Sequence, residues 1–99
     1  MLEYIEKYTI ANAKPSMVVI WLHGLGADFN DFVSLVPELK LNKCVKFIFP
    51  NAPLRPITIN NGHVMRGWYD ILDYNMEANV DSAGINNSVV AIEDLIQRE

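Results

Sequence analysis

The feature that most constrains the fold of this chain is an unbroken apolar run that ends in a glycine-containing loop. The run, MVVIWL at residues 17–22, is apolar at every position and rich in β-branched residues. Such a segment predicts a strand buried on both faces, as found in parallel sheets that helices cover. The residues that follow read His-Gly-Leu-Gly. Glycines at the end of a strand indicate that the backbone approaches something closely.

Two further segments predict strands. Residues 2–10 alternate between two faces, which is the period of a strand. Residues 44–50, CVKFIFP, form a short apolar run that Pro50 stops. We expect the connection from the 17–22 strand to the 44–50 strand to be parallel and right-handed.

Two other segments predict helices. Asn30 or Asp31 is expected to cap the first, which Pro37 should shorten or kink. The second is expected over residues 82–98, behind a cap at Asp81 or Ser82. Its apolar stripe consists of Ile85, Val89, Ile92 and Ile96.

Residues 51–80 lack periodicity and are expected to form one long loop, of a kind that is often functional. Strands that alternate with helices indicate an α/β fold class. The 99 residues are enough for one small domain.

Composition excludes several classes of function. The net charge is −4 and no basic stripe is present, so nucleic acid is not expected as a partner. The single cysteine, Cys44, excludes an internal disulfide and a cysteine-rich metal site, and it suits a reducing compartment. With no signal-peptide core and no stretch long enough to span a membrane, we expect a cytoplasmic location without stable membrane insertion.

Three interpretations of the loop at residues 23–26 compete. The first is a tight strand-to-helix turn that needs glycine for backbone freedom. The second is a dinucleotide-binding loop, but Phe29 stands where that motif has its third glycine, and no acidic residue ends the next strand. The third is an oxyanion hole, in which a backbone N–H stabilises the negative charge of an acyl intermediate.

Four segments in order favour the third interpretation: VIWLHGLGAD, FIFPNAP, TINNG and WYD. Together they resemble the carboxylesterase, phospholipase and acyl-protein thioesterase family of α/β-hydrolases, from about residue 18 to residue 99. The resemblance implies the N-terminal half of an α/β-hydrolase fold, with a mostly parallel sheet flanked by helices. Residues 1–99 would then form a single incomplete domain that ends before the nucleophile strand. Phe29 and Gly67 depart from the family's usual glycine and alanine.

The same resemblance implies roles for particular residues. Leu25 would donate an oxyanion-hole N–H, and Gly24 and Gly26 would give the loop its geometry. His23 would be structural and not the catalytic base. The residues expected to border the acyl pocket are Arg66, Trp68 and Tyr69.

The family's nucleophile, which lies in a G-x-S-x-G elbow, has no counterpart in these residues. None of the four serines has glycine at both second neighbours. The acid and base of the triad follow the nucleophile in this fold, so they are not expected here either. We interpret His63 as a surface residue and Cys44 as a small core residue.

The resemblance therefore predicts a serine hydrolase that cleaves carboxylic esters or acyl thioesters through an acyl-enzyme, without a metal or organic cofactor. The 99 residues alone are expected to be inactive. The alternatives are a non-catalytic remnant or interaction module and a small nucleotide-binding domain. We also expect residues 17–22 to form an open sheet edge, which invites a complementing chain or self-association.

Overall fold

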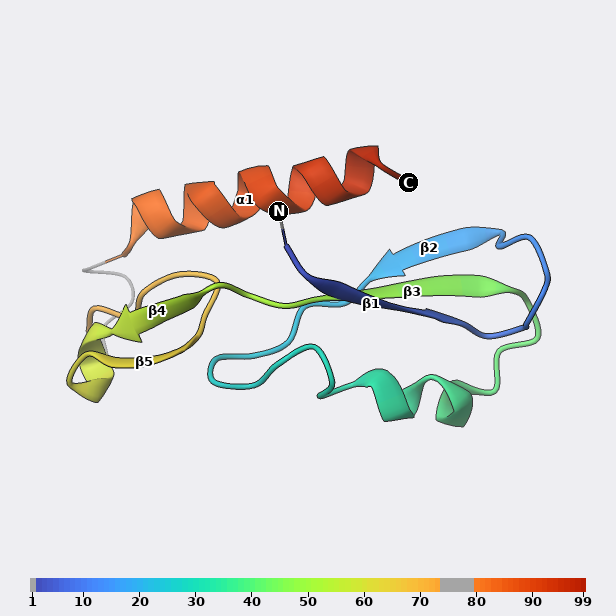
Figure 1. Ribbon diagram of the computed structural model, residues 1–99, viewed down its shortest axis with the longest axis horizontal. Helices are drawn as coiled ribbons and strands as arrows, with labels where there is room; N and C mark the ends of the chain where they lie inside the picture. The colour runs from blue at the N-terminus through green and yellow to red at the C-terminus, as the bar shows by residue number, and fades with distance from the viewer. Residues whose placement is uncertain (1, 74–79) are drawn as a thin grey trace.

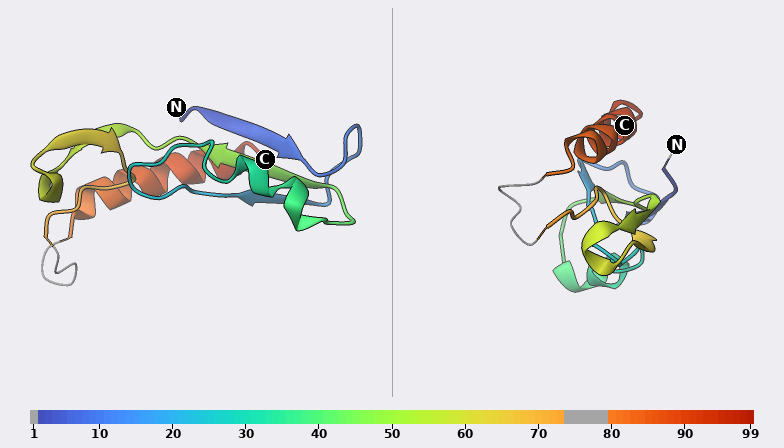
Figure 2. Two further views of the ribbon diagram at one scale, coloured as in Figure 1. Left: turned by 90° about the horizontal axis from the view of Figure 1, so that it is seen from below. Right: turned by 90° about the vertical axis from the view of Figure 1, so that its left-hand side faces the viewer.

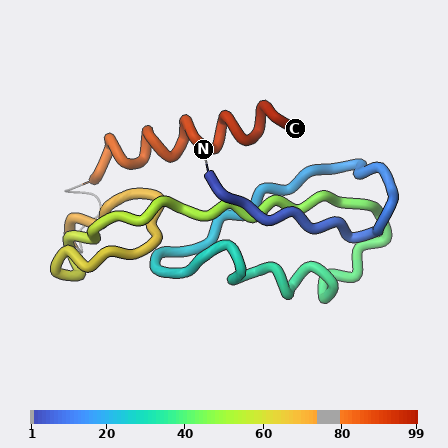
Figure 3. The backbone as a smooth tube through the Cα atoms, viewed as in Figure 1, coloured from blue at the N-terminus to red at the C-terminus, as the bar shows by residue number. Residues whose placement is uncertain are grey.

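The computed structural model of the protein describes residues 2–73 and 80–99 (Figure 1). A three-stranded sheet and a two-stranded sheet follow one another along the molecule, and the helix runs alongside both (Figures 1 and 3). The molecule is elongated, with principal extents of 45 × 26 × 23 Å. The elements are β1 (Tyr4–Tyr8), β2 (Met17–Ile20), β3 (Val45–Pro50), β4 (Leu54–Ile57), β5 (His63–Arg66), α1 (Ser82–Gln97) and three 3₁₀ turns, η1 (Val33–Leu35), η2 (Pro37–Leu39) and η3 (Thr58–Asn60).

The larger sheet has the order β1-β3-β2 and is mixed rather than mostly parallel. β2 pairs with β3 in parallel, so the predicted parallel connection is confirmed. β1 pairs with β3 antiparallel, with Tyr4 opposite Pro50. The prediction of a mostly parallel sheet is therefore wrong for the part of the chain that the structure describes.

The strand buried on both faces is β3, not β2. Five of the six residues of β3 are buried, because strands flank it on both sides, the η1–η2 segment covers one face and α1 covers the other. β2 stands at the edge of the sheet, where Met17 is 59% exposed and Val18 is 39% exposed. The strand predicted at residues 17–22 is confirmed over residues 17–20, but its predicted burial on both faces is not found in the described residues.

The core lies between one face of the sheet and the segment that carries η1 and η2. Trp21 stacks on Phe32 with ring centroids 5.0 Å apart, and its ring also lies 6.1 Å from that of Phe49. Burying a large apolar side chain contributes about 1.5–3 kcal/mol. The buried members of this cluster are Val36, Val45, Phe47 and Phe49.

The opposite face of the sheet meets α1 (Figure 2). Lys46 of β3 forms an ion pair with Glu99, just beyond α1, so Ile48, two residues along the same strand face, also lies on the helix side. Ile48 is fully buried, and Leu95 of α1 is 4% exposed.

The two predicted helices fare differently. In place of the first helix the structure has the two short 3₁₀ turns η1 and η2. The residue that precedes η1 is Phe32, whose side chain makes no capping hydrogen bond, so the predicted caps at Asn30 or Asp31 are wrong. The second is confirmed as α1, where the Asp81 carboxylate accepts a 2.9 Å hydrogen bond from the Gly84 N–H. Within residues 2–73 and 80–99, no helix combines the length and hydropathy needed to cross a bilayer.

The segment predicted as one long loop contains a β-hairpin. β4 pairs antiparallel with β5, and η3 and a turn connect them. Asn61 and Gly62 of the turn have φ angles of 56° and 76°, a backbone conformation that asparagine and glycine tolerate. Residues 74–79 of the predicted loop lie outside the described residues.

Candidate active site

The loop at residues 23–26 follows the C-terminal end of β2 and lies against β5. The Gly26 N–H donates a 2.9 Å hydrogen bond to the Arg66 carbonyl, which anchors the loop to the hairpin. Gly26 has a φ of +77°, so a side chain there would strain the backbone. Gly24 has no such restriction, and a Cβ added to it meets no atom within 4 Å.

The Leu25 N–H forms no hydrogen bond to any other residue that the structure describes. Leu25 is 47% exposed. A backbone donor without a protein acceptor, in the loop that follows a strand, is compatible with an oxyanion hole.

The His23 side chain fixes the loop through hydrogen bonds at both of its ring nitrogens. Its ring is buried, and Nε2 accepts a 3.0 Å hydrogen bond from the Ala52 N–H. Nδ1 therefore carries the proton and donates to the Gly24 carbonyl at 2.8 Å. Because both ring nitrogens are engaged, His23 is a structural residue in this arrangement and offers no free nitrogen for proton transfer.

Trp68, two residues beyond β5 of the hairpin, contacts the loop at residues 23–26. Its indole Nε1 donates to the His23 carbonyl at 2.9 Å, and the two rings lie 5.4 Å apart. The Ser88 hydroxyl of α1 donates to the Trp68 carbonyl. Trp68 is half-buried, and its position is fixed from both the loop and the helix.

A cavity of about 230 Å³ lies where these parts meet. The structure brings Gly24, Leu25, Trp68 and Tyr69 to its wall. Arg66 lies elsewhere: its guanidinium donates to the Ala52 carbonyl at 3.0 Å, so among the described residues it braces the hairpin rather than lining this cavity. The remaining lining residues are His23 and Ile71.

A polar cluster that the sequence did not predict fixes the segment around Trp68. The Asp81 carboxylate accepts hydrogen bonds from the Asp70 N–H at 2.8 Å and from the Gly84 N–H, and lies 3.9 Å from the Arg55 guanidinium. These hydrogen bonds, and then the Arg55 charge, hold the pKa of Asp81 below its ordinary value of 3.8. Arg55 Nε also donates to the Gly67 carbonyl at 2.8 Å. The only sequence signal for this cluster was the expected cap at Asp81.

Gly84 packs directly against the carboxylate of this cluster. A Cβ there would lie 2.1 Å from Asp81 Oδ2, so a side chain would force the Asp81 carboxylate out of its present position. Gly67 is also closely packed, because a Cβ would lie 3.2 Å from Leu25 Cδ1. The Leu25 side chain therefore packs against the backbone at Gly67, the residue that follows β5.

A second, strongly apolar groove of about 370 Å³ adjoins the site through Trp68 and Tyr69. We call it the α1 groove. Its other apolar residues are Leu22, Ile85, Val89, Ile92 and Ile96, and Ser88 and Glu93 complete the lining.

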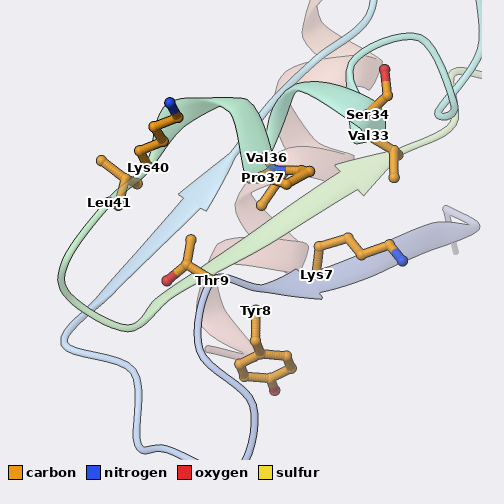
Figure 4. Close-up of a pocket in the computed structure, with 9 residues that line it drawn as sticks. All are labelled: Lys7, Tyr8, Thr9, Val33, Ser34, Val36, Pro37, Lys40 and Leu41. Atoms are coloured by element: carbon orange, nitrogen blue, oxygen red, sulfur yellow. The ribbon is translucent and has the colours of Figure 1, made fainter.

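A separate cavity of about 360 Å³ lies between β1 and the η1–η2 segment (Figure 4). It shares no lining residue with the candidate site. Lys7 and Lys40 lie on either side of Val36 and Pro37, so their charges do not converge on one point (Figure 4). No group of three or more metal-ligating side chains occurs within the described ranges.

The fold and the loop define part of an α/β-hydrolase. The Phospholipase/Carboxylesterase family matches residues 6–99, and the chain belongs to this family. It is 40% identical over 98 residues to acyl-protein thioesterase 1 of Debaryomyces hansenii, covering 90% of this chain and 42% of that protein. The corresponding protein of Neurospora crassa is 43% identical over 97 residues, covering 90% of this chain and 40% of that protein.

Solved structures show the same partial match. The crystal structure of Zea mays acyl-protein thioesterase 2 superposes with a TM-score of 0.82 at 27% identity. That superposition covers 96% of this chain and 41% of the maize chain. The chain therefore spans about two fifths of the length of the relatives it matches.

Proposed function

We propose that this chain supplies the oxyanion-binding loop and an acyl-pocket wall of a serine hydrolase. The substrate class is a small carboxylic ester or acyl thioester, hydrolysed through an acyl-enzyme. The observation that carries the proposal is the Leu25 N–H, which has no acceptor among the described residues and stands beside the cavity walled by Trp68 and Tyr69.

In the proposed reaction a serine oxygen attacks the acyl carbonyl carbon while a histidine takes the serine proton. Negative charge develops on the carbonyl oxygen, where the Leu25 N–H donates a hydrogen bond. The histidine then returns the proton to the departing alcohol or thiol, and water cleaves the acyl-enzyme. One oxyanion donor typically lowers the barrier by about 2.7–4 kcal/mol.

The serine of this reaction would come from polypeptide outside residues 1–99, because these residues contain no G-x-S-x-G elbow. The acid and the histidine would come from there as well, because they follow the serine along the chain in this fold. His23 is engaged at both ring nitrogens. Gly24 and Gly26 shape the loop. The Arg66 carbonyl holds the loop by accepting a hydrogen bond from the Gly26 N–H. We keep the cytoplasm as the expected location, since a single cysteine suits a reducing compartment.

A chimera tests this proposal. Residues 1–99 replace the matching part of the Debaryomyces hansenii relative, and hydrolysis of short- and long-chain acyl esters and thioesters is measured. We expect turnover that a serine-directed phosphonate abolishes. A folded chimera that neither reacts with the phosphonate nor hydrolyses any of these substrates would overturn the proposal.

A second candidate function is a non-catalytic interaction module, which the open edge of β2 favours. The 99-residue chain alone separates the two candidates. The hydrolase proposal expects no turnover above a protein-free blank and an aggregated, oligomeric or loosely packed state. A monomer with a sharp cooperative melt would favour the interaction module.

A further inference from the structure

We infer that Asp81, together with Arg55, positions one wall of the cavity at the candidate site and thereby sets its preference for longer acyl chains. This wall is formed by residues 67–71, which we call the wall segment. Its residues in the cavity lining are Trp68, Tyr69 and Ile71. The inference deepens the proposed function and rests on it for the nature of the substrate.

The wall segment has no regular secondary structure of its own. It follows β5, and in the described part of the chain residues 67–73 belong to neither a helix nor a strand. Individual hydrogen bonds, rather than a ladder, therefore hold its backbone. Trp68 and Tyr69 line both the cavity and the α1 groove, so a shift of the wall segment changes the depth of the cavity.

Asp81 divides its two carboxylate oxygens between α1 and the wall segment. Oδ1 accepts the 2.9 Å hydrogen bond from the Gly84 N–H and caps the helix. Oδ2 accepts a 2.8 Å hydrogen bond from the Asp70 N–H, at the far end of the pair Trp68 and Tyr69. Hydrogen bonds to a charged acceptor are stronger than those between neutral groups. A helix cap needs only one oxygen, so the second oxygen has a separate task at the wall segment.

Arg55 holds the near end of the wall segment. Its Nε donates to the Gly67 carbonyl at 2.8 Å, and its Nη1 lies 3.9 Å from Asp81 Oδ2. Arg55 comes from β4 and Asp81 precedes α1, and these parts of the chain lie at the same end of the molecule (Figure 1). Each side chain is 20% exposed, which limits the screening of their charges by solvent. The two side chains therefore fix both ends of the Trp68–Tyr69 pair from two different elements.

The oxyanion loop depends mainly on other contacts. It is anchored by the hydrogen bond from the Gly26 N–H to the Arg66 carbonyl and by the two hydrogen bonds of the His23 ring. The wall segment meets this loop through the Trp68 indole. A displaced wall segment should therefore weaken the binding of an acyl chain more than it slows the chemical step.

Two substitutions in the chimera separate wall positioning from helix capping. Asp81→Ser keeps one oxygen for the cap, where serine is about as good as aspartate, but has no second oxygen for the Asp70 N–H. Gly84→Ala keeps the carboxylate and introduces a better helix former, but its Cβ would collide with Asp81 Oδ2 and displace that oxygen. Asp94→Ser, on the same helix at a side chain that is 57% exposed, is the matched control.

Selectivity between a long and a short acyl ester is the first measurement. Hydrolysis of p-nitrophenyl octanoate and p-nitrophenyl acetate is followed for each variant, per active site titrated with the phosphonate. Both test substitutions should lower kcat/KM for the octanoate by roughly tenfold, mainly through KM, and leave the acetate within about twofold. The acetate has a single methyl group as its acyl chain and so has little contact with the wall segment. A role confined to stability would lower the active fraction without changing the ratio between the two esters, and Asp94→Ser should change neither.

Amide exchange tests the placement of the wall segment without catalysis. In both test variants the Asp70 amide should exchange faster than in the parent chimera, while the Ile48 amide of β3 is unchanged. An inactive parent chimera would overturn the proposed function and the acyl-chain preference that rests on it, and exchange alone would then decide the placement. The placement is overturned if Asp70 exchanges at the parental rate in both variants. In an active chimera, the preference is overturned if the octanoate and the acetate lose equally or if Asp94→Ser has the same effect as Asp81→Ser.

Discussion

The indole N–H of Trp68 donates a 2.9 Å hydrogen bond to the backbone carbonyl of His23. The bond connects residues 45 positions apart, one beside the hairpin and one at the base of the loop. His23 in turn donates to the Gly24 carbonyl. The position of the loop therefore depends on a residue that also walls the cavity.

Replacing Trp68 with phenylalanine should loosen the loop. The substitution keeps an aromatic ring but removes the donor to His23, and a typical hydrogen bond contributes about 0.5–1.5 kcal/mol. In the chimera we expect a lower melting temperature and faster exchange of the Gly26 amide, with the Ile48 amide in β3 as an internal control. Unchanged exchange at Gly26 would mean that Trp68 does not hold the loop.

Gly26 and Gly24 should respond differently to alanine. At Gly26 the φ of +77° makes alanine costly by about 1–2 kcal/mol, whereas Gly24 has an unrestricted φ and open space for a Cβ. Urea unfolding of the chimera should therefore show a clear loss of stability for Gly26→Ala and little change for Gly24→Ala. Equal losses at the two positions would contradict the geometry of the loop.

The Asp81 cluster should contribute stability that disappears in acid. The pKa of Asp81 is lowered in the folded protein, so its contribution is present above the ordinary value of 3.8 and is lost as pH falls through the folded value. In the chimera, Asp81→Asn should lower the free energy of unfolding at pH 7, and the difference from the parent chimera should shrink toward pH 3. Asp94→Asn, at a carboxylate that is 57% exposed, is the control and should have a smaller effect at pH 7. A pH-independent difference at Asp81 would contradict this account.

Lys46 should give the opposite pH dependence. Its hydrogen bond to Glu99 at 2.5 Å, and then its interaction with Glu6 at 3.2 Å, raise the pKa of Lys46 above its ordinary value of 10.5. The stabilising contribution is complete below pH 10.5 and is lost as pH rises through the folded value. In the chimera, Lys46→Met should therefore lower the melting temperature near neutral pH more than Lys7→Met does. Equal effects would show that the ion pairs do not hold α1 to the sheet.

The sequence predicted the elements whose signals are local. Asp81 and the apolar stripe identified α1 because a cap and a helical period both lie within a few residues. The sequence analysis did not predict the hairpin, because Pro56 lies inside β4 and no alternation marks either strand. The pair Asn61-Gly62 is nevertheless typical of a hairpin turn. The edge position of β2 depends on which strands are present beside it, which no local pattern records.

The candidate site shows the same division. Leu25 was assigned from a motif that is contiguous in sequence, and the structure places it at a cavity with Trp68 and Tyr69. Arg66 was expected at the acyl pocket, yet it contacts the Ala52 carbonyl. The Arg55–Asp81 ion pair joins residues 26 positions apart, so no spacing rule predicts it.

The most direct test of the central claim compares two substitutions of Leu25 in the chimera. Leu25→Pro removes the backbone N–H, and Leu25→Ala keeps the N–H while removing the side chain. If the Leu25 N–H stabilises the oxyanion, the proline variant should lose roughly 10²–10³ in kcat while the alanine variant stays within about tenfold of the parent. A folded proline variant that hydrolyses acyl esters at the parental rate would contradict the assignment of Leu25 as an oxyanion donor.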